Sequence, residues 1–165
     1  MSNETILTLN LKPHLEDFVR HELKTDKSGN IILSRHSDIG KMIFSHLLTA
    51  GSIQARPLMD HPVKFLVLTN ANNSYLLRSR FCYVDRWGEQ KINDFIEVEF
   101  RQRMRLIFEA GYQKKCSQKE IIEAIMEEYN IKNCTLNYDA IKKSDYRNQK
   151  KVRKTLFDTL QSIVL

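Results

Sequence analysis

The feature of the sequence that most constrains the fold is a regular recurrence of apolar residues between Arg86 and Gly111. Successive apolar side chains lie one to four residues apart in the rhythm of one helix face, which predicts an amphipathic α-helix. The segment would make about seven turns, and Gly111 is expected to end it. A helix of this length indicates a spine for the fold or a homodimer contact, through Ile92, Phe95 and Phe100. The recurring residues are Ile92, Phe95, Ile96, Phe100, Met104, Ile107 and Phe108.

The residues before this helix show both strand and helix patterns. In "TILTLNL", residues 5–11, Leu7, Leu9 and Leu11 share one face, and this period of two indicates a half-buried strand. A helix is expected over 13–24, opened by Pro13. Short strands are expected in "IILS" and in "PVKFLVLTN", which is rich in β-branched and aromatic residues. Residues 75–84 fit a strand or the start of a helix.

Between "IILS" and "PVKFLVLTN", the stretch "SDIGKMIFSHLLTAG" predicts a second helix. Ser37 is the expected N-cap. Ile39, Ile43, Leu47 and Leu48 form the expected buried stripe, and we expect the helix to end at Gly51.

After Gln113 every pattern is helical. Ser117 and Glu120 have the spacing of a capping box, which predicts the start of a helix. Its expected core face is Ile121, Ile122, Ile125, Met126 and Tyr129. We therefore predict an α+β fold with two domains. Residues 1–112 form a small mixed α/β domain that ends in the long helix, and residues 113–165 form a helical, helix-turn-helix-like basic module.

The last predicted helix, "YDAIKKSDYRNQKKVRKTL", is strongly basic. Between Lys142 and Lys154 it holds seven Lys or Arg and one acid, Asp145. Its middle lacks an apolar stripe, so we expect that part to project into solvent or onto a partner. Its start is expected to be anchored by Tyr138 and Ile141, and its end by Val152, Leu156, Leu160 and Ile163.

The residue types of this helix suit nucleic acid. Lys and Arg neutralise phosphates, Asn148 and Gln149 have the chemistry to read adenine edges, and Tyr146 can contact phosphate or stack. Two helices with the second one basic follow the order of a helix-turn-helix, although the gap from Tyr129 to Tyr138 exceeds the usual three or four residues. The predicted nucleic-acid-binding residues are Lys142, Lys143, Tyr146, Arg147, Asn148, Lys150, Lys151, Arg153 and Lys154.

Two alternatives remain open at this point. The basic helix fits an acidic protein surface as well as double-stranded DNA, and the net charge of +6 favours either polyanion. The N-terminal order of strand, helix and helix also resembles the ribbon-helix-helix family, in which Thr8 and Asn10 would face DNA. The competing interpretation is a plain α/β subdomain whose first strand pairs with "KFLVL".

Motifs of catalysis and of metal binding are missing from the sequence. It holds no Gly-rich phosphate loop, no HExxH, no GxSxG and no CxxC. Three scattered cysteines predict reduced thiols. We therefore expect a non-enzymatic protein with no catalytic residue, no metal and no cofactor. No apolar run is long enough to span a membrane, and the first residues do not have the pattern of a secretory signal. The expected location is the cytoplasm, that of the host cell if a phage encodes the chain.

Several stretches together resemble small proteins of Bacteroidetes phages and integrative elements. These are "LNLKPHLEDFVRHEL", "KFLVL", "FEAGYQKK" and "KEIIEAIMEEYNI" followed by "YDAIKKSDYR". The tail resembles the helix-turn-helix of Mor-type phage activators, and this resemblance implies DNA contacts by Lys142, Lys143, Tyr146 and Arg147. The expected function is a DNA-binding regulator of a phage or mobile element. The alternative is a protein-interaction or virion-assembly protein whose basic helix binds an acidic protein or packaged DNA.

Overall fold

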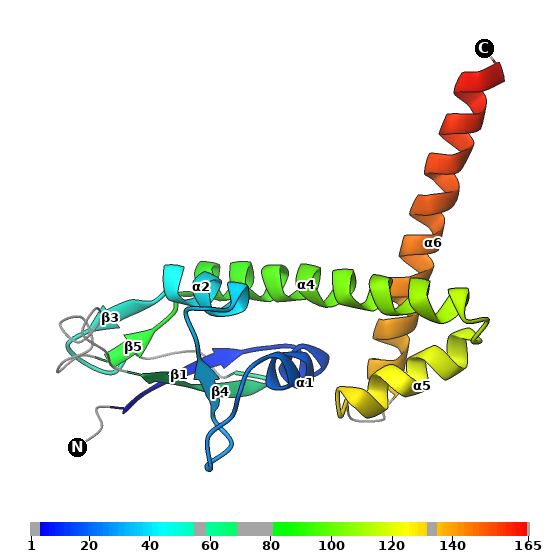
Figure 1. Cartoon of the computed structure of the whole chain (residues 1–165). Helices are drawn as coiled ribbons and strands as arrows, with labels where there is room; N and C mark the ends of the chain where they lie inside the picture. Colours follow the sequence, from blue (N-terminus) through cyan, green and yellow to red (C-terminus); the bar gives the residue numbers. More distant parts are fainter. Residues whose placement is uncertain (1–3, 55–58, 69–80, 132–134, 165) are drawn as a thin grey trace. The chain divides into compact units, whose positions relative to one another are not determined.

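A computed structural model describes residues 4–54, 59–68, 81–131 and 135–164 of the chain (Figure 1). It has the predicted α+β fold, with helices in the majority. The elements are β1 Glu4–Asn10, α1 Pro13–Glu22, β2 Ile31–Leu33, α2 Asp38–Ser45, β3 Leu48–Ala50, β4 Pro62–Leu68, β5 Phe81–Tyr83, α4 Arg86–Gln113, α5 Gln118–Glu128 and α6 Thr135–Val164. No described helix combines the length and the apolar character that crossing a membrane requires.

The chain divides into two compact units, residues 1–98 and residues 99–165. The division falls inside α4, whereas the sequence places it at the end of that helix, between residues 112 and 113.

The first unit is built on a three-stranded sheet in the order β1-β4-β2. β1 runs antiparallel to β4, with Leu7 opposite Phe65 and Leu9 opposite Val63, and β2 runs parallel to β4. Leu7 and Leu9 are buried, as the period of two predicts. The pairing of β1 with "KFLVL" follows the plain α/β interpretation and not the ribbon-helix-helix one, in which first strands of two copies pair.

Helix α1 begins at Pro13 and buries its apolar face, Leu15, Phe18 and Val19, as predicted. His14 is buried beside them, and its Nε2 lies 3.2 Å from Glu97 Oε2 on α4. This pair ties the start of α1 to the part of α4 that belongs to the same unit.

Helix α2 is shorter than predicted. Ser37 caps it as expected, since its Oγ accepts a hydrogen bond of 3.0 Å from the Gly40 amide. The helix ends at Ser45 and not at Gly51. The expected burial of Leu48 is wrong because residues 48–50 form β3, which pairs with β5, and the Leu48 side chain is exposed. Residues 81–83 of the ambiguous stretch form β5, and residues 75–80 lie outside the described residues.

The second unit consists of the C-terminal half of α4, together with α5 and α6. Its core is apolar, and the capping box of Ser117 and Glu120 at the start of α5 is present as predicted. α6 continues to Val164, well beyond the predicted basic segment. The buried hydrophobic side chains of this unit are Phe100, Met104, Phe108, Ile121, Ile122, Ile125, Met126, Tyr129, Ile131 and Ile141.

The end of α4 differs from the prediction in its mechanism. The helix runs through Gly111 to Gln113, and the residue with the left-handed backbone is Lys115, whose φ is 62°. The Cys116 amide donates to the Gly111 carbonyl at 3.0 Å and closes the turn. At Gly111 a Cβ atom would lie 2.6 Å from the Ile121 side chain, so this glycine allows α5 to approach α4 closely.

The predicted dimer contact on α4 is wrong in its central residues. Ile92 and Phe100 are 0% and 1% exposed, and Phe95 is half-buried. Their apolar face is covered by the chain itself, so it is not available to a second copy.

Candidate nucleic-acid interface

The N-terminal half of α6 is held by one face. Ile141, Ser144 and Asp145 on this face are buried, and Asn148 one turn later is half-buried. Their spacing of three and four residues places them on one side of the helix. The predicted middle segment therefore does not project freely, because a mostly polar face packs it against its own unit.

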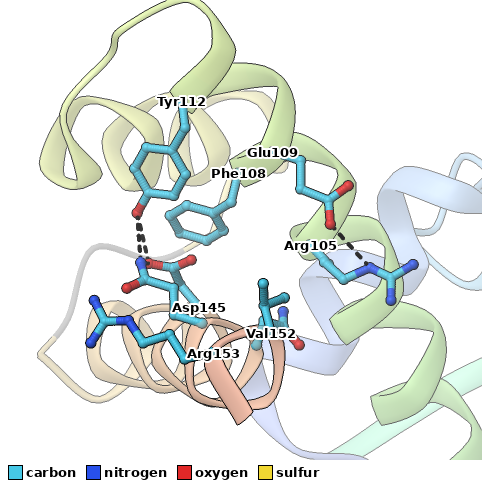
Figure 2. Close-up of a pocket in the computed structure, with 9 residues that line it drawn as sticks. Arg105, Phe108, Glu109, Tyr112, Asp145, Val152 and Arg153 are labelled. Atoms are coloured by element: carbon cyan, nitrogen blue, oxygen red, sulfur yellow. Dashed lines mark hydrogen bonds and ion pairs between the residues drawn. The ribbon is translucent and has the colours of Figure 1, made fainter. Parts of the chain in front are cut away.

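Asp145 is the centre of that packing. Its Oδ2 atom accepts a hydrogen bond from Tyr112 Oη of α4 at 2.7 Å (Figure 2). It also accepts from Gln118 Nε2 of α5 at 2.6 Å and from Gln149 Nε2 of α6 itself at 2.8 Å. Hydrogen bonds to a charged acceptor are stronger than neutral ones. The one acid in the basic run, Asp145, thus joins all three helices of the unit. The sequence analysis did not predict this role. The available clue was an acid among seven cations.

The same cluster perturbs Tyr112. Partial burial, followed by the hydrogen bond and the negative charge of Asp145, raises the pKa of the Tyr112 hydroxyl to about 12. Ionised Tyr112 would lose its donated proton and face a carboxylate. The hydroxyl therefore stays protonated and donates to Asp145 throughout the neutral range.

Outside its packed face, α6 carries the predicted cations, of which Arg153 lies nearest the packed face and borders the pocket described below. All seven are exposed, and among the residues that the structure describes none of them forms an ion pair. Four of them follow a spacing of four, three and four residues, which aligns them in one stripe along the helix. We call these four residues the basic stripe: Lys143, Arg147, Lys150 and Lys154.

The remaining predicted residues lie in three different places on α6. Lys142, Tyr146 and Arg153 form a second exposed line beside the basic stripe, and Tyr146 is 65% exposed. Lys151 is exposed at the other edge of the stripe. Asn148 is placed apart from this surface, because it lies on the packed side of α6. Gln149 is likewise engaged, since its amide donates to Asp145 and to Tyr112 Oη.

The packed side of α6 also borders a small pocket within the second unit, of about 200 Å³. Phe108 and Tyr112 of α4 line one wall, and Asn148, Val152 and Arg153 of α6 line the other (Figure 2). The Asn148 Nδ2 atom is buried without a hydrogen-bond partner among the described residues. The pocket is mainly apolar, and Val152 at its edge is largely exposed.

The distal part of α6 contradicts the sequence prediction most clearly. Val152, Leu156, Leu160 and Ile163 were expected to anchor the helix, yet they are 62%, 58%, 53% and 75% exposed. Every described side chain from Lys150 to Ile163 is exposed. The reason is geometric, because α6 extends beyond the α4 and α5 segments of its own unit, as its orange-to-red half shows in Figure 1.

A second polar cluster lies in the first unit and has a structural character. Glu16 accepts from Arg20 Nε at 2.8 Å and is paired with His61 Nε2. Burial alone raises the pKa of Glu16, but the hydrogen bonds and charges of Arg20 and His61 outweigh it and lower the pKa below the ordinary value. Among the described residues, no group of three or more His, Cys, Asp or Glu side chains is arranged to hold a metal ion.

No protein-family model, no curated protein and no solved structure matches this chain.

Proposed function

We propose that the chain binds double-stranded DNA through the exposed face of α6. The observation that supports this most is the basic stripe, in which Lys143, Arg147, Lys150 and Lys154 align on a helix whose other side is fixed by Ile141 and Asp145. Since the cations have no acidic partner among the described residues, their charge is available to phosphates. Because the helix backbone is already held in place, binding orders the cationic side chains but little backbone.

The dimensions of α6 suit the major groove, which is wide enough to admit an α-helix. The basic stripe extends over about 16 Å of helix, and the line of Lys142, Tyr146 and Arg153 runs beside it. Lys and Arg at the edges would contact the two phosphate backbones, while Arg147 and Tyr146 near the centre would reach base edges. Asn148 is left out of this role because it faces the packed side.

The resemblance of the tail to Mor-type activators gives the proposal its context, a regulator of a phage or mobile element. α5 and α6 stand in the order of a helix-turn-helix, with a connection of residues 129–134 in place of the usual three or four residues. In that arrangement α6 is the recognition helix and α5 the supporting one.

Equilibrium binding to a labelled random duplex tests the proposal. The affinity of the wild-type chain should fall steeply as the salt concentration rises. If all seven cations contact phosphates, a plot of log K against log salt concentration has a slope of about −6, and fewer contacts give a shallower slope. Lys143→Glu with Arg147→Glu should abolish binding in the micromolar range. Lys24→Glu with Lys27→Glu is the matched control, because it makes the same charge change at exposed lysines of the first unit.

Three outcomes would count against the proposal. The first is equal DNA binding by the Lys143/Arg147 variant and the parent. The second is an equal loss in the Lys24/Lys27 control, which would indicate an effect of net charge alone. The third is a chain that ignores duplex DNA but binds polyglutamate, which would identify the acidic-protein alternative. A selection from random duplexes then separates a regulator, which enriches one site, from a protein that packages DNA without site preference.

A further inference from the structure

We propose that two copies of the chain pair through the distal part of α6, in antiparallel orientation. The pairing surface is a line of four residues, Val152, Leu156, Leu160 and Ile163, which we call the seam. In the paired state Val152 lies opposite Ile163 of the partner subunit, and Leu156 lies opposite Leu160 of the partner subunit. The inference does not depend on DNA binding, because the seam and the basic stripe occupy different sides of α6.

The seam continues a face that is already used for packing. Its residues are spaced by four, four and three, and they prolong the side of α6 on which Ile141 and Asp145 are buried. The change from buried to exposed occurs at Val152, which also borders the pocket with Phe108 and Tyr112. A stripe of this kind, left uncovered over three turns, marks a surface that meets another molecule.

Charge indicates that the other molecule is a second copy. From Thr155 to Ile163 the only charged residue is Asp158, and its spacing from Leu156 and Leu160 puts it on the side away from the seam. An acidic amphipathic helix or an anionic membrane surface would be matched by Lys or Arg on the polar face beside the seam, and from Thr155 to Ile163 that face has none. An uncharged apolar seam instead favours an uncharged apolar partner surface. The seam of a second copy is such a surface.

Charge also determines the orientation of the two helices. A parallel pair would place the basic ends of both helices at the same level, with Arg153 of each copy, which flanks Val152, nearest the other, where like charges repel. An antiparallel pair moves each group to the C-terminal end of the other α6, where the helix dipole is negative. The antiparallel seam is also self-complementary. Its outer residues, Val152 and Ile163, lie opposite the outer residues of the partner, and its inner residues, Leu156 and Leu160, lie opposite the inner ones.

The size of the seam predicts a weak dimer. Burying an aliphatic side chain fully removes about 100 Å² of apolar surface, and the four seam residues are already covered in part. With flanking side chains, two copies bury roughly 800 Å² in total, which is below the range of stable complexes. The pairing should therefore depend on protein concentration, and half of the chains should be dimeric at a concentration between about 10 and 500 µM.

Analytical ultracentrifugation of the full chain without DNA tests the pairing. The wild-type mass should rise from one copy toward two as concentration increases through that range. Leu156→Glu should remain monomeric, since two carboxylates would enter an apolar contact, while circular dichroism confirms an unchanged fold. Ile53→Glu is the matched control, because Ile53 is also an exposed apolar residue but lies in the first unit, and this variant should dimerise as the parent does.

Disulfide trapping tests the orientation in a chain whose Cys82, Cys116 and Cys134 are replaced by Ser. A mixture of Val152→Cys and Ile163→Cys chains should form cross-linked pairs under mild oxidation, and Ile163→Cys alone should not.

A chain that stays monomeric up to 500 µM overturns the proposal, as does a dimer that Leu156→Glu leaves intact. Cross-linking of Ile163→Cys alone overturns the antiparallel register, and a monomer that floats with anionic vesicles assigns the seam to a membrane.

Discussion

The hydrogen bonds to Asp145 predict how the second unit loses stability. Replacing Asp145 by Ala removes the acceptor of three donors, from Tyr112, Gln118 and Gln149. A hydrogen bond to a charged group contributes about 1.5–3 kcal/mol. Tyr112 is 37% exposed and the two glutamines are half-buried, so water replaces part of each lost bond. About 1 kcal/mol for each donor is the appropriate value, and we expect a loss of about 3 kcal/mol in the free energy of unfolding of this unit.

Hydrogen exchange followed by mass spectrometry measures this loss locally. Amides in the Ile141–Asn148 segment should exchange about 100-fold faster in Asp145→Ala than in the parent, since 1.4 kcal/mol corresponds to a factor of ten. The fluorescence of Trp87, the only tryptophan, reports on the first unit and should be unchanged. Asp158→Ala is the control, because it removes an exposed acid from the same helix.

Two further variants sharpen the test. Asp145→Asn keeps one carbonyl acceptor and should lose only about 1 kcal/mol. In the parent, the pKa of Tyr112 is raised to about 12, above its ordinary value of 10.0. The stabilisation linked to Tyr112 is therefore complete below pH 10.0 and is lost as pH rises toward about 12. Tyr112→Phe should remove this alkaline loss in a titration of helix content. If Asp145→Ala changes exchange no more than Asp158→Ala does, the cluster does not hold α6 in place, and the reasoning fails.

Three other predictions address single elements. Gly40→Ala should destabilise the first unit by about 3 kcal/mol, because its Cβ would lie 1.7 Å from the Ser34 carbonyl oxygen, while Gly51→Ala, with open space around it, should be neutral in the same denaturation assay. Glu16→Gln should reduce the loss of stability at acid pH. The lowered pKa of Glu16 stabilises the folded chain above pH 4.5, the ordinary pKa, and this stabilisation is lost as pH falls through the native pKa. If the free energy of unfolding of the variant and of the parent falls equally with decreasing pH, this prediction is wrong. Lys115→Gly should raise the melting temperature by a few degrees, because a left-handed backbone is strained for lysine by about 1 kcal/mol, and an unchanged or lower value would refute it.

Local patterns predicted the elements whose causes are local. Pro13, Ser37 and the Ser117–Glu120 capping box act within one turn of the residues they cap, so each appears where the sequence places it. The period of two in β1 likewise predicts which residues are buried. β3 was missed because Leu48 belongs to an apolar run with helical spacing. Its strand conformation depends on β5, about thirty residues later, which no local pattern reveals.

The candidate site shows the same division. Exposure of the cations follows from their charge and was predicted correctly for each Lys and Arg. The position of Asp145 was not predictable in the same way, since its burial depends on Tyr112 and Gln118, which lie on other helices. Asn148 shares that face by its spacing from Asp145, and so it lines the pocket with Phe108.

The two apolar stripes of the second unit differ in what covers them, and this difference limits what periodicity can predict. On α4, Phe100, Met104 and Phe108 are buried by their own chain, whereas on α6 Leu156 and Leu160 are exposed, although both stripes have helical spacing. Periodicity therefore indicates that a face is suited to apolar contact, but the covering partner depends on which elements the chain brings there. Within the same unit, α5 approaches α4 at Gly111, and α6 lines a pocket together with Phe108. For the distal part of α6 no described segment of that unit covers the seam, of which only Val152 borders the pocket of Phe108 and Tyr112, and we propose that a second copy covers it.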